Sequence, residues 1–377
     1  MQVAKVITED GRIRYYLADD EGLPIEAVLK YLRFKDNVGY ARNTLRMQCT
    51  HLKQFFTFLD ERRKDYRNIN IDVLAGFIAW LQNSYIHQNV VPFLLHPERM
   101  PQTVNKVVDT VIAFYDYLVR HDEFESTLPE KLVKFIKMPG RNYRSFLAGI
   151  ADCKAAHMKS SILKLPMPHM GIKVITKEAA TTLLRETTNM RDHFLLYLLF
   201  ETGLRIGEAL SLWLEDFDVG ENKIHLKDRG ELENQAEIKS VTSPRTLDMT
   251  QELADMFMDY VCVFHTCDVK TNHVFVKIIG PETGKAMTYT NVDNLFRTLR
   301  AKTGIEITPH MFRHTSLSLL YSAGWAPELL RKRAGHKNIY TTINTYVHPS
   351  DEEVAEEFHR TASKLTGPIK ETEVPEK

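Results

Sequence analysis

Two segments of the chain bring together side chains that are suited to chemistry on a charged group. The first segment, residues 201–208, reads ETGLRIGE and contains Arg205. The second, residues 308–348, reads TPHMFRHTSLSLLYSAGWAPELLRKRAGHKNIYTTINTYVH. Because its first histidine and its first arginine stand three residues apart, a helix would present both on one face. The candidates in this second segment are His310, Arg313, His336 and Tyr346.

Arginine, histidine and tyrosine in this combination favour chemistry on an anionic ester such as a phosphodiester. The guanidinium groups of Arg205 and Arg313 are always charged, and each can hold two anionic oxygens at once. They therefore place positive charge at the site before any reaction begins. A tyrosine hydroxyl with a pKa of about 10 is a weak nucleophile at neutral pH, so Tyr346 needs cationic neighbours and a base.

The order and spacing of these residues resemble the signature of the tyrosine site-specific recombinase, or phage integrase, family. Within that family they resemble the integrases and transposases of mobile elements. Residues 201–208 resemble the box that holds the first arginine, and Tyr346 follows His336 by ten residues, between two threonines and a histidine. The resemblance covers residues 176–349 well and the N-terminal half only by its helical pattern.

The resemblance implies a role for each residue of this signature. Tyr346 is the nucleophile that becomes joined to a DNA phosphate, His310 is the general base, and His336 hydrogen-bonds the scissile phosphate. The leaving 5′-oxygen needs a proton, and a lysine whose pKa falls beside other cations can supply it. Similar enzymes place this lysine between the second and third strands of a small sheet, where Lys239 stands, with Lys227 as the second candidate.

Each of these residues also has a purely structural interpretation. An arginine on a helix is usually a solvated surface group, and Arg205 alone would be one. Likewise His310 alone would fit a helix N-terminus, and Tyr346 alone would fit a core. A chance occurrence of the whole set in this order is far rarer than that of any one member. The tyrosines that compete for the role of nucleophile are Tyr289, Tyr321 and Tyr340.

Residues beside the signature receive supporting roles. We expect Glu208 to orient the site or to cap a helix, and His314 and Thr315 to pack against or brace their helix. The run Arg331–Arg333 stands where many family members have an apolar pair. It either adds contacts to DNA or belongs to the surface.

Composition predicts a cytoplasmic globular protein, and the resemblance implies that it associates with the nucleoid when it binds DNA. The 377 residues are 44% hydrophobic and 26% charged, and no apolar run is long enough to span a bilayer. The four cysteines do not resemble a disulfide framework. A zinc site can be drawn through the group Cys262, His265, Cys267 and His273, but its spacing fits no common finger. We expect neither a metal nor another cofactor.

Charge is balanced overall, with 49 basic and 49 acidic residues, but it is distributed unevenly. Ten basic and two acidic residues lie between positions 126 and 177, whereas four basic and eight acidic residues follow position 350. We therefore expect a basic strap on the DNA backbone and an acidic tail that stays away from DNA. The residues predicted to bind DNA are Lys131, Lys134, Lys137, Arg141, Arg144 and Lys173.

Apolar periodicity predicts a mainly α-helical chain with a small antiparallel β-sheet. Two β-prone runs around Asp10-Gly11 predict a hairpin from residues 3–7 and 13–16. Helical spacing recurs in the N-terminal half at residues 23–35, 41–62, 71–84 and 103–121. Three further β-prone runs, at residues 223–227, 236–239 and 245–249, predict the small sheet.

These patterns divide the chain into five parts. They are an N-terminal β-hairpin (1–21), a helical core DNA-binding domain (22–138), a basic linker (139–173), a catalytic domain (174–350) and a C-terminal tail with a short amphipathic helix (351–377). The resemblance implies that the helical domain is SAM-like and the catalytic domain α+β. It also implies that the two close on DNA as a C-shaped clamp.

The function that the resemblance implies is site-specific recombination through a 3′-phosphotyrosyl intermediate, for the integration, excision or transposition of a mobile element. Its partners would be double-stranded recombination sites, three further copies of the chain at synapsis, and accessory DNA-bending or directionality proteins, with no membrane. Two alternatives stay open, relaxation of DNA as by a type IB topoisomerase and resolution of chromosome dimers. A DNA-binding regulator on an inactive scaffold would lack Arg205, Arg313 or Tyr346, and all three are present.

Overall fold

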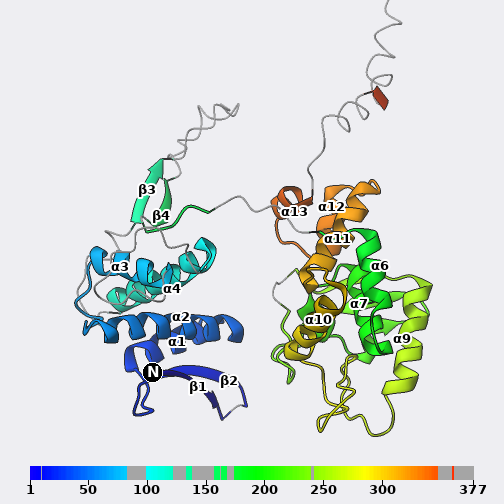
Figure 1. The fold of residues 1–377 in the computed structure, drawn as a ribbon, viewed down its shortest axis with the longest axis horizontal. Helices are drawn as coiled ribbons and strands as arrows, with labels where there is room; N and C mark the ends of the chain where they lie inside the picture. The colour runs from blue at the N-terminus through cyan, green and yellow to red at the C-terminus, as the bar shows by residue number, and fades with distance from the viewer. Residues whose placement is uncertain are drawn as a thin grey trace, which may run out of the picture. The chain divides into compact units, whose positions relative to one another are not determined.

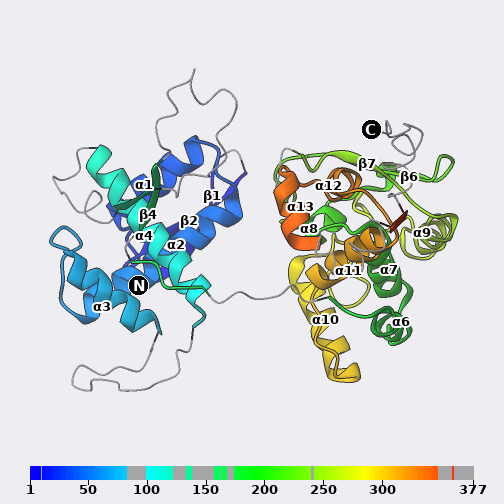
Figure 2. The same cartoon turned by 90° about the horizontal axis from the view of Figure 1, so that it is seen from above.

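The computed structural model describes residues 1–9, 11–82, 99–121, 133–137, 157–161, 163–167, 174–238, 242–346 and 359–360; for residues 133–137, 157–161 and 344–346 it describes the backbone alone. Contacts along the chain divide it into unit 1, residues 1–169, and unit 2, residues 170–377. Figure 1 and Figure 2 show the two units from directions at right angles.

Unit 1 begins with the β-hairpin that its turn sequence predicts. Strands β1 (Gln2–Ile7) and β2 (Ile13–Ala18) pair antiparallel along their whole length. Gly11 has a φ of 78°, which glycine adopts without steric cost. The hairpin packs against α2, and Leu17 at the end of β2 is fully buried in the core of unit 1.

Four amphipathic helices form the body of unit 1, and each lies within a few residues of its predicted range. Their apolar faces meet in a core rich in aromatic rings, where Phe55 makes edge contacts with Phe77 and Tyr115 at centroid distances of 5.1 and 6.0 Å. Such pairs add to the free energy gained by burial. The helices are α1 (Glu26–Asn37), α2 (Arg42–Glu61), α3 (Ile71–Gln82) and α4 (Pro101–Arg120).

A second strand pair differs from the expectation for this region. Strands β3 (Val133–Lys137) and β4 (His157–Ser161) pair antiparallel, although β4 falls in the segment predicted to be a linker. The segment 163–167 is hydrogen-bonded to helix α4. Asn105 on α4 donates from Nδ2 to the Leu165 carbonyl (3.0 Å) and accepts from the Leu165 amide (2.8 Å). Side chain to backbone bonds thus anchor a stretch in which the sequence has no regular apolar period.

Unit 2 is mainly helical, with α7 and α11 packed side by side near its centre (Figure 1). Local capping explains where several helices begin, because Thr176, Asn189 and Thr250 each accept a hydrogen bond from an amide in the first turn that follows. The helices are α6 (Lys177–Arg185), α7 (Met190–Thr202), α8 (Ile206–Leu210), α9 (Gln251–Phe264), α10 (Tyr289–Thr303), α11 (Pro309–Ser322), α12 (Pro327–Ala334) and α13 (Ile339–Tyr346).

The predicted three-stranded antiparallel sheet is present in unit 2, but one of its strands was misplaced. Its order is β5 (Phe217–Asp218), β6 (Lys223–Leu226) and β7 (Arg245–Asp248). The predicted strand at 236–239 is wrong, since residues 236–238 form no strand and residue 239 is outside the described residues. Asn234 provides the reason: its side chain donates to the carbonyls of Leu210 and Met287 and accepts from the Ala236 amide, so this segment is held on α8 instead of in a ladder.

Neither a membrane span nor a metal cluster is found among the described residues. None of their helices is long and apolar enough to cross a bilayer. No three of their histidine, cysteine, aspartate or glutamate side chains are grouped as metal ligands. In the zinc alternative, His265 and His273 instead hydrogen-bond the carbonyls of Val274 and Leu210 at 2.8 and 3.2 Å.

The buried side chain of Asn234 should therefore matter for stability. Asn234→Ala removes three buried hydrogen bonds and leaves the Met287 carbonyl and the Ala236 amide without the partner that Asn234 provides, whereas the Leu210 carbonyl keeps its bond from His273. The free energy of unfolding should therefore fall by about 2 kcal/mol or more. Urea denaturation followed by circular dichroism measures this change. Asn294→Ala is the matched control, because Asn294 is exposed and bonds only Arg297 through its side chain. Equal stability of the two variants would contradict the role given to Asn234.

Candidate active site

Arg205 lies in the sharp connection between α7 and α8. It is the N-cap residue of α8, and its backbone N–H donates to Oε2 of Glu208 at 2.9 Å. Its Nη1 donates to Oε1 of the same carboxylate at 2.7 Å. One glutamate thus fixes both the backbone and the guanidinium of Arg205. Because the side chain remains 24% exposed, the guanidinium is accessible to an anion from solvent.

Glu208 is a carboxylate that is only 1% exposed and lies among three arginines. Arg245 donates to both of its oxygens, at 3.2 and 3.1 Å, and Nη1 of Arg313 lies 3.8 Å from Oε2. Burial by itself raises the pKa of Glu208. The hydrogen bonds and charge of Arg245, with the charges of Arg313 and Arg205, outweigh burial and lower this pKa to about 2. Three positive charges against one negative charge leave a surplus of two, which suits a phosphate.

Arg313 is fully buried on α11 and joins the other parts of the site. Its Nη1 donates to the Gly203 carbonyl at 2.7 Å, and its Nη2 donates to the Ala334 carbonyl at 2.5 Å. Nη2 also donates to Nε2 of His336 at 3.1 Å. The end of α7, helix α11 and the end of α12 therefore meet at one guanidinium.

His336 is a buried, neutral histidine that follows α12. Burial lowers its pKa to about 4, and the charges of Arg313, Arg205 and Arg245 act in the same direction. Arginine has only donors, so Nε2 of His336 must accept the bond from Arg313. The proton of the neutral ring is then on Nδ1, which donates to Oγ1 of Thr342 on α13 at 2.9 Å.

His310 is an exposed residue in the first turn of α11, on the same helix as Arg313. Its ring contacts that of His314 edge-on, with centroids 4.4 Å apart. Burial, with smaller contributions from His310 and Arg313, lowers the pKa of His314 to about 4. Thr315 braces the helix as expected, since its Oγ1 accepts from the Ile175 amide at 3.0 Å and donates to the Met311 carbonyl at 2.8 Å.

The other two predicted catalytic residues are described less fully. Tyr346 is the last residue of α13, and its side chain lies outside the described part of the chain. Lys239 lies outside it entirely, in the connection between β6 and β7, which are the second and third strands of the sheet. The Nζ of Lys227 is 3.4 Å from Oδ1 of Asp216, which also binds Arg229. These contacts place Lys227 with Asp216 and not with the arginines around Glu208.

None of the six residues predicted to bind DNA has a described side chain. The backbone of Lys134 and Lys137 belongs to β3. The other four, Lys131, Arg141, Arg144 and Lys173, lie outside the described residues, as does the predicted helix of the tail apart from residues 359–360. These assignments stay predictions.

Arg245 is a member of the site that sequence reasoning missed. It is the first residue of β7, yet its guanidinium reaches Glu208 on α8. No spacing rule links the two positions, which are 37 residues apart. The only available signal was an arginine at the start of a predicted strand directly after the loop of Lys239. The Arg331–Arg333 run also contributes to the site, because Arg331 donates to the His336 carbonyl and Arg333 to the Glu201 carbonyl.

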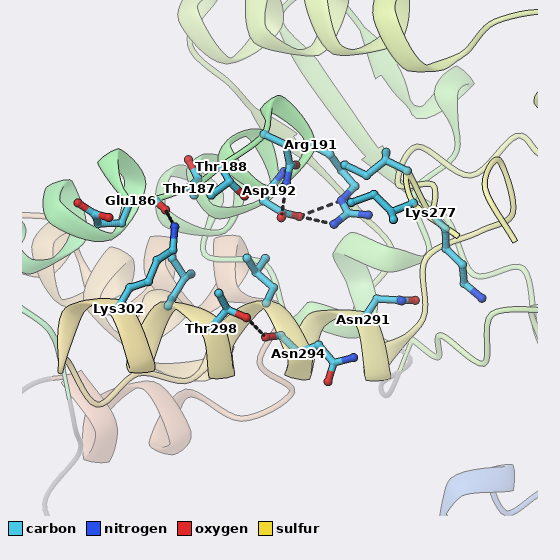
Figure 3. A pocket seen from close by; sticks show the side chains of 15 residues that line it. Glu186, Thr187, Thr188, Arg191, Asp192, Lys277, Asn291, Asn294, Thr298 and Lys302 are labelled. Atoms are coloured by element: carbon cyan, nitrogen blue, oxygen red, sulfur yellow. Dashed lines mark hydrogen bonds and ion pairs between the residues drawn. The ribbon is translucent and has the colours of Figure 1, made fainter. Parts of the chain in front are cut away.

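Two cavities in unit 2 differ in their relation to this cluster. A cavity of about 740 Å³ is lined by Arg245, Gly335 and His336 together with basic side chains of α12. A smaller one of about 280 Å³, shown in Figure 3, is lined by none of the predicted site residues. Its cationic side chains bond to neighbouring groups, since Arg191 pairs with Asp192 at 2.6 Å and Lys302 donates to the Glu186 carbonyl at 3.3 Å (Figure 3). The larger cavity therefore belongs to the candidate active site.

Comparison with known proteins agrees with this arrangement. The model of the phage integrase family matches residues 172–353. Transposase A from transposon Tn554 of Staphylococcus aureus is 34% identical over 347 residues, which cover 92% of this chain and 93% of the relative. The chain belongs to the phage integrase family. It is a tyrosine recombinase, an enzyme that breaks and rejoins DNA strands.

Other members of the phage integrase family share the fold at lower identity. Tyrosine recombinase XerD from Lacticaseibacillus casei is 23% identical over 328 residues, 82% of this chain and 97% of the relative. The Tn1549 transposon integrase in complex with circular intermediate DNA matches with a TM-score of 0.59 at 17% identity, over 88% of this chain and 98% of that one. XerH recombinase bound to its difH substrate matches with a TM-score of 0.56 at 15% identity, over 89% and 84%. These likenesses confirm the predicted fold class.

The charge of Glu208 should be required to keep the arginine cluster folded. Glu208→Gln keeps the shape but leaves buried guanidinium groups uncompensated, so at pH 7 the free energy of unfolding should fall by about 3 kcal/mol or more. Because the pKa of Glu208 is lowered by folding, its contribution is complete above pH 4.5 and is lost as the pH falls through about 2. In urea denaturation, the difference in the free energy of unfolding between wild type and variant should be smaller at pH 3 than at pH 7.

A suitable control is Glu215→Gln, which removes an exposed carboxylate that also faces an arginine. Its effect should stay within about 1 kcal/mol at both pH values. A Glu208→Gln protein as stable as this control at pH 7 would show that the buried charge is not needed.

Proposed function

We propose that this enzyme carries out site-specific recombination of a mobile element by cutting and rejoining DNA. The observation that carries the proposal is the meeting of Arg205, Arg313 and neutral His336 around the buried carboxylate of Glu208. A relative that is 34% identical along nearly the whole chain is named a transposase, which supports a mobile element over chromosome-dimer resolution.

The scissile phosphate binds at the arginine cluster in this proposal. The partly exposed guanidinium of Arg205 and the buried one of Arg313 attract its non-bridging oxygens, and their charge stabilises the additional charge that develops during attack. Glu208 holds both groups in place beforehand, so little reorganisation is needed. For His336 to donate a hydrogen bond to the phosphate, its Nε2 must carry the proton and give up the bond that it accepts from Arg313 here.

The covalent step transfers the phosphate from DNA to tyrosine. The hydroxyl of Tyr346 attacks phosphorus while His310 takes its proton, the bond to the 5′-oxygen breaks, and Lys239 protonates that oxygen. The products are a 3′-phosphotyrosyl link and a free 5′-hydroxyl. Attack by a 5′-hydroxyl from a second DNA reverses the step and releases Tyr346 without ATP. The charges of arginine and lysine stabilise the developing negative charge here, whereas other phosphoryl-transfer enzymes use metal ions for this purpose.

The nucleophile is tested by removing one oxygen atom. Tyr346→Phe should bind DNA as wild type does but form no covalent adduct, because no other group takes over the attack. Adducts on a nicked suicide substrate are separated by denaturing gel electrophoresis. Tyr340→Phe, which alters the other tyrosine of α13, serves as the control and should retain adduct formation. Adducts formed by Tyr346→Phe but not by Tyr340→Phe would move the assignment to Tyr340.

The general acid is tested by changing the leaving group. Lys239→Ala should cleave ordinary DNA about a hundredfold or more slowly, since an unprotonated alkoxide is a poor leaving group. DNA with a 5′-bridging sulfur should restore the rate, because a thiolate leaves without a proton. Lys227→Ala is the control and should cleave both substrates alike. Equal defects of Lys239→Ala on both substrates would reject this residue as the acid.

The proposed assembly on DNA includes both units and more than one copy of the chain. Unit 1 would act as the core-binding domain and the six predicted basic residues as contacts to the backbone, so that the two units clamp the duplex. Two duplexes and two strand exchanges require four subunits at synapsis. Crosslinking of Tyr346→Phe on paired sites counts these subunits. One subunit on one duplex, with relaxation of supercoils by wild type, would favour the topoisomerase alternative. Accessory proteins and association with the nucleoid remain parts of the same proposal.

A further inference from the structure

Arg245 binds three segments of unit 2 that lie far apart in the sequence. Its side chain is only 8% exposed. Nε donates to the Arg333 carbonyl on α12 at 2.7 Å, Nη1 donates to the Ser243 carbonyl at 2.7 Å, and both terminal nitrogens donate to Glu208 on α8. The guanidinium thus connects the arginine cluster, the start of β7 and the end of α12.

The turn at Gly335 is built around this guanidinium. Gly335 has a φ of 63°, and a Cβ atom there would lie 2.8 Å from Nη1 of Arg245 and 3.1 Å from the Thr242 carbonyl. Both the conformation and the space therefore require glycine. A second bond joins the same two segments, since Oγ1 of Thr242 donates to the Gly335 carbonyl at 3.2 Å. The turn that presents His336 is consequently fixed to residues 242–245.

Residues 242–245 also form the end of the loop that carries Lys239. Thr242 is the third residue after Lys239, so their Cα atoms are at most about 10 Å apart. Any shift of Thr242 and Arg245 relative to α12 would move this end of the loop relative to His336. The bonds of Arg245 and Thr242 therefore fix residues 242–245, the described end of this loop, relative to α12 and Glu208.

We propose that Arg245 is a positioning residue that sets the loop of Lys239 against the phosphate-binding groups of the active site. The proposal rests on the role of Lys239 as general acid. Arg245 does not itself need to touch DNA. It acts through the Arg333 carbonyl and Glu208, and it holds both because arginine has several donors in a planar fork, whereas lysine has a single nitrogen.

Arg245→Lys tests this role because it keeps the charge and loses the bridge. Cleavage of ordinary DNA should slow by about tenfold or more, since small misplacements of reacting groups are costly. On DNA with a 5′-bridging sulfur, which needs no proton from Lys239, its rate should return to within about threefold of wild type. DNA binding should be unchanged.

Arg229→Lys is the matched control, since Arg229 also makes a two-point bond to a buried carboxylate, that of Asp216, at 2.9 and 2.7 Å. It should lose similar stability but cleave both substrates as wild type does. Thr242→Val removes the second bond to the turn without removing charge. It should show the same selective defect on ordinary DNA, to a smaller extent, and it keeps the test valid if Arg245→Lys does not fold.

Measuring Lys239→Ala in parallel separates the possible failures. If the sulfur substrate rescues Lys239→Ala but neither Arg245→Lys nor Thr242→Val, Arg245 supports the fold or the phosphate and does not position the loop. If the sulfur substrate fails to rescue Lys239→Ala, the assignment of the acid is wrong, and the inference about Arg245 falls with it. Rescue of all three, with the control unaffected, supports the proposal.

Discussion

The attraction between one buried carboxylate and three guanidinium groups is the interaction on which the rest of unit 2 depends. Three arginines would repel one another strongly in a region with little water, because charges interact over longer distances where the dielectric constant is low. Glu208 allows Arg205, Arg245 and Arg313 to share one small volume. In the proposed mechanism, a phosphate that binds at this site meets positive charge that is already concentrated in one place.

Three elements of unit 2 place the charged groups of this cluster close together. Helix α8 supplies Glu208, and Arg205 is the N-cap residue of the same helix. Strand β7 supplies Arg245, and α11 supplies Arg313. Packing of α7 against α11 holds the backbone carbonyl that Arg313 binds. Groups carried by regular elements are placed with less freedom than groups on loops, which suits chemistry that needs charge in a fixed position.

Sequence reasoning predicted the residues of the family signature, and it missed Arg245, which belongs to no local pattern and is held by a long-range contact. His310 and Arg313 share a helix, so spacing alone placed them together. Arg245 reaches Glu208 from another element, and no local pattern encodes that contact. The misplaced strand at 236–239 has a related cause, because β-propensity there is overridden by side-chain bonds from Asn234 to distant carbonyls. Strands β3 and β4 were missed because their lysines were assigned to a basic DNA-binding segment, and the alternation of polar and apolar residues was not considered.

The hydrogen bond between His336 and Thr342 makes the chemistry of one residue depend on the docking of another helix. Thr342 belongs to α13, the helix that ends at Tyr346. With α13 in place, the imidazole has one defined tautomer and presents its lone pair to Arg313. If α13 moves away, Nδ1 loses this acceptor and the ring is free to exchange tautomers or rotate. The tautomer of His336, next to Arg313, thus depends on whether the helix that ends at Tyr346 is docked.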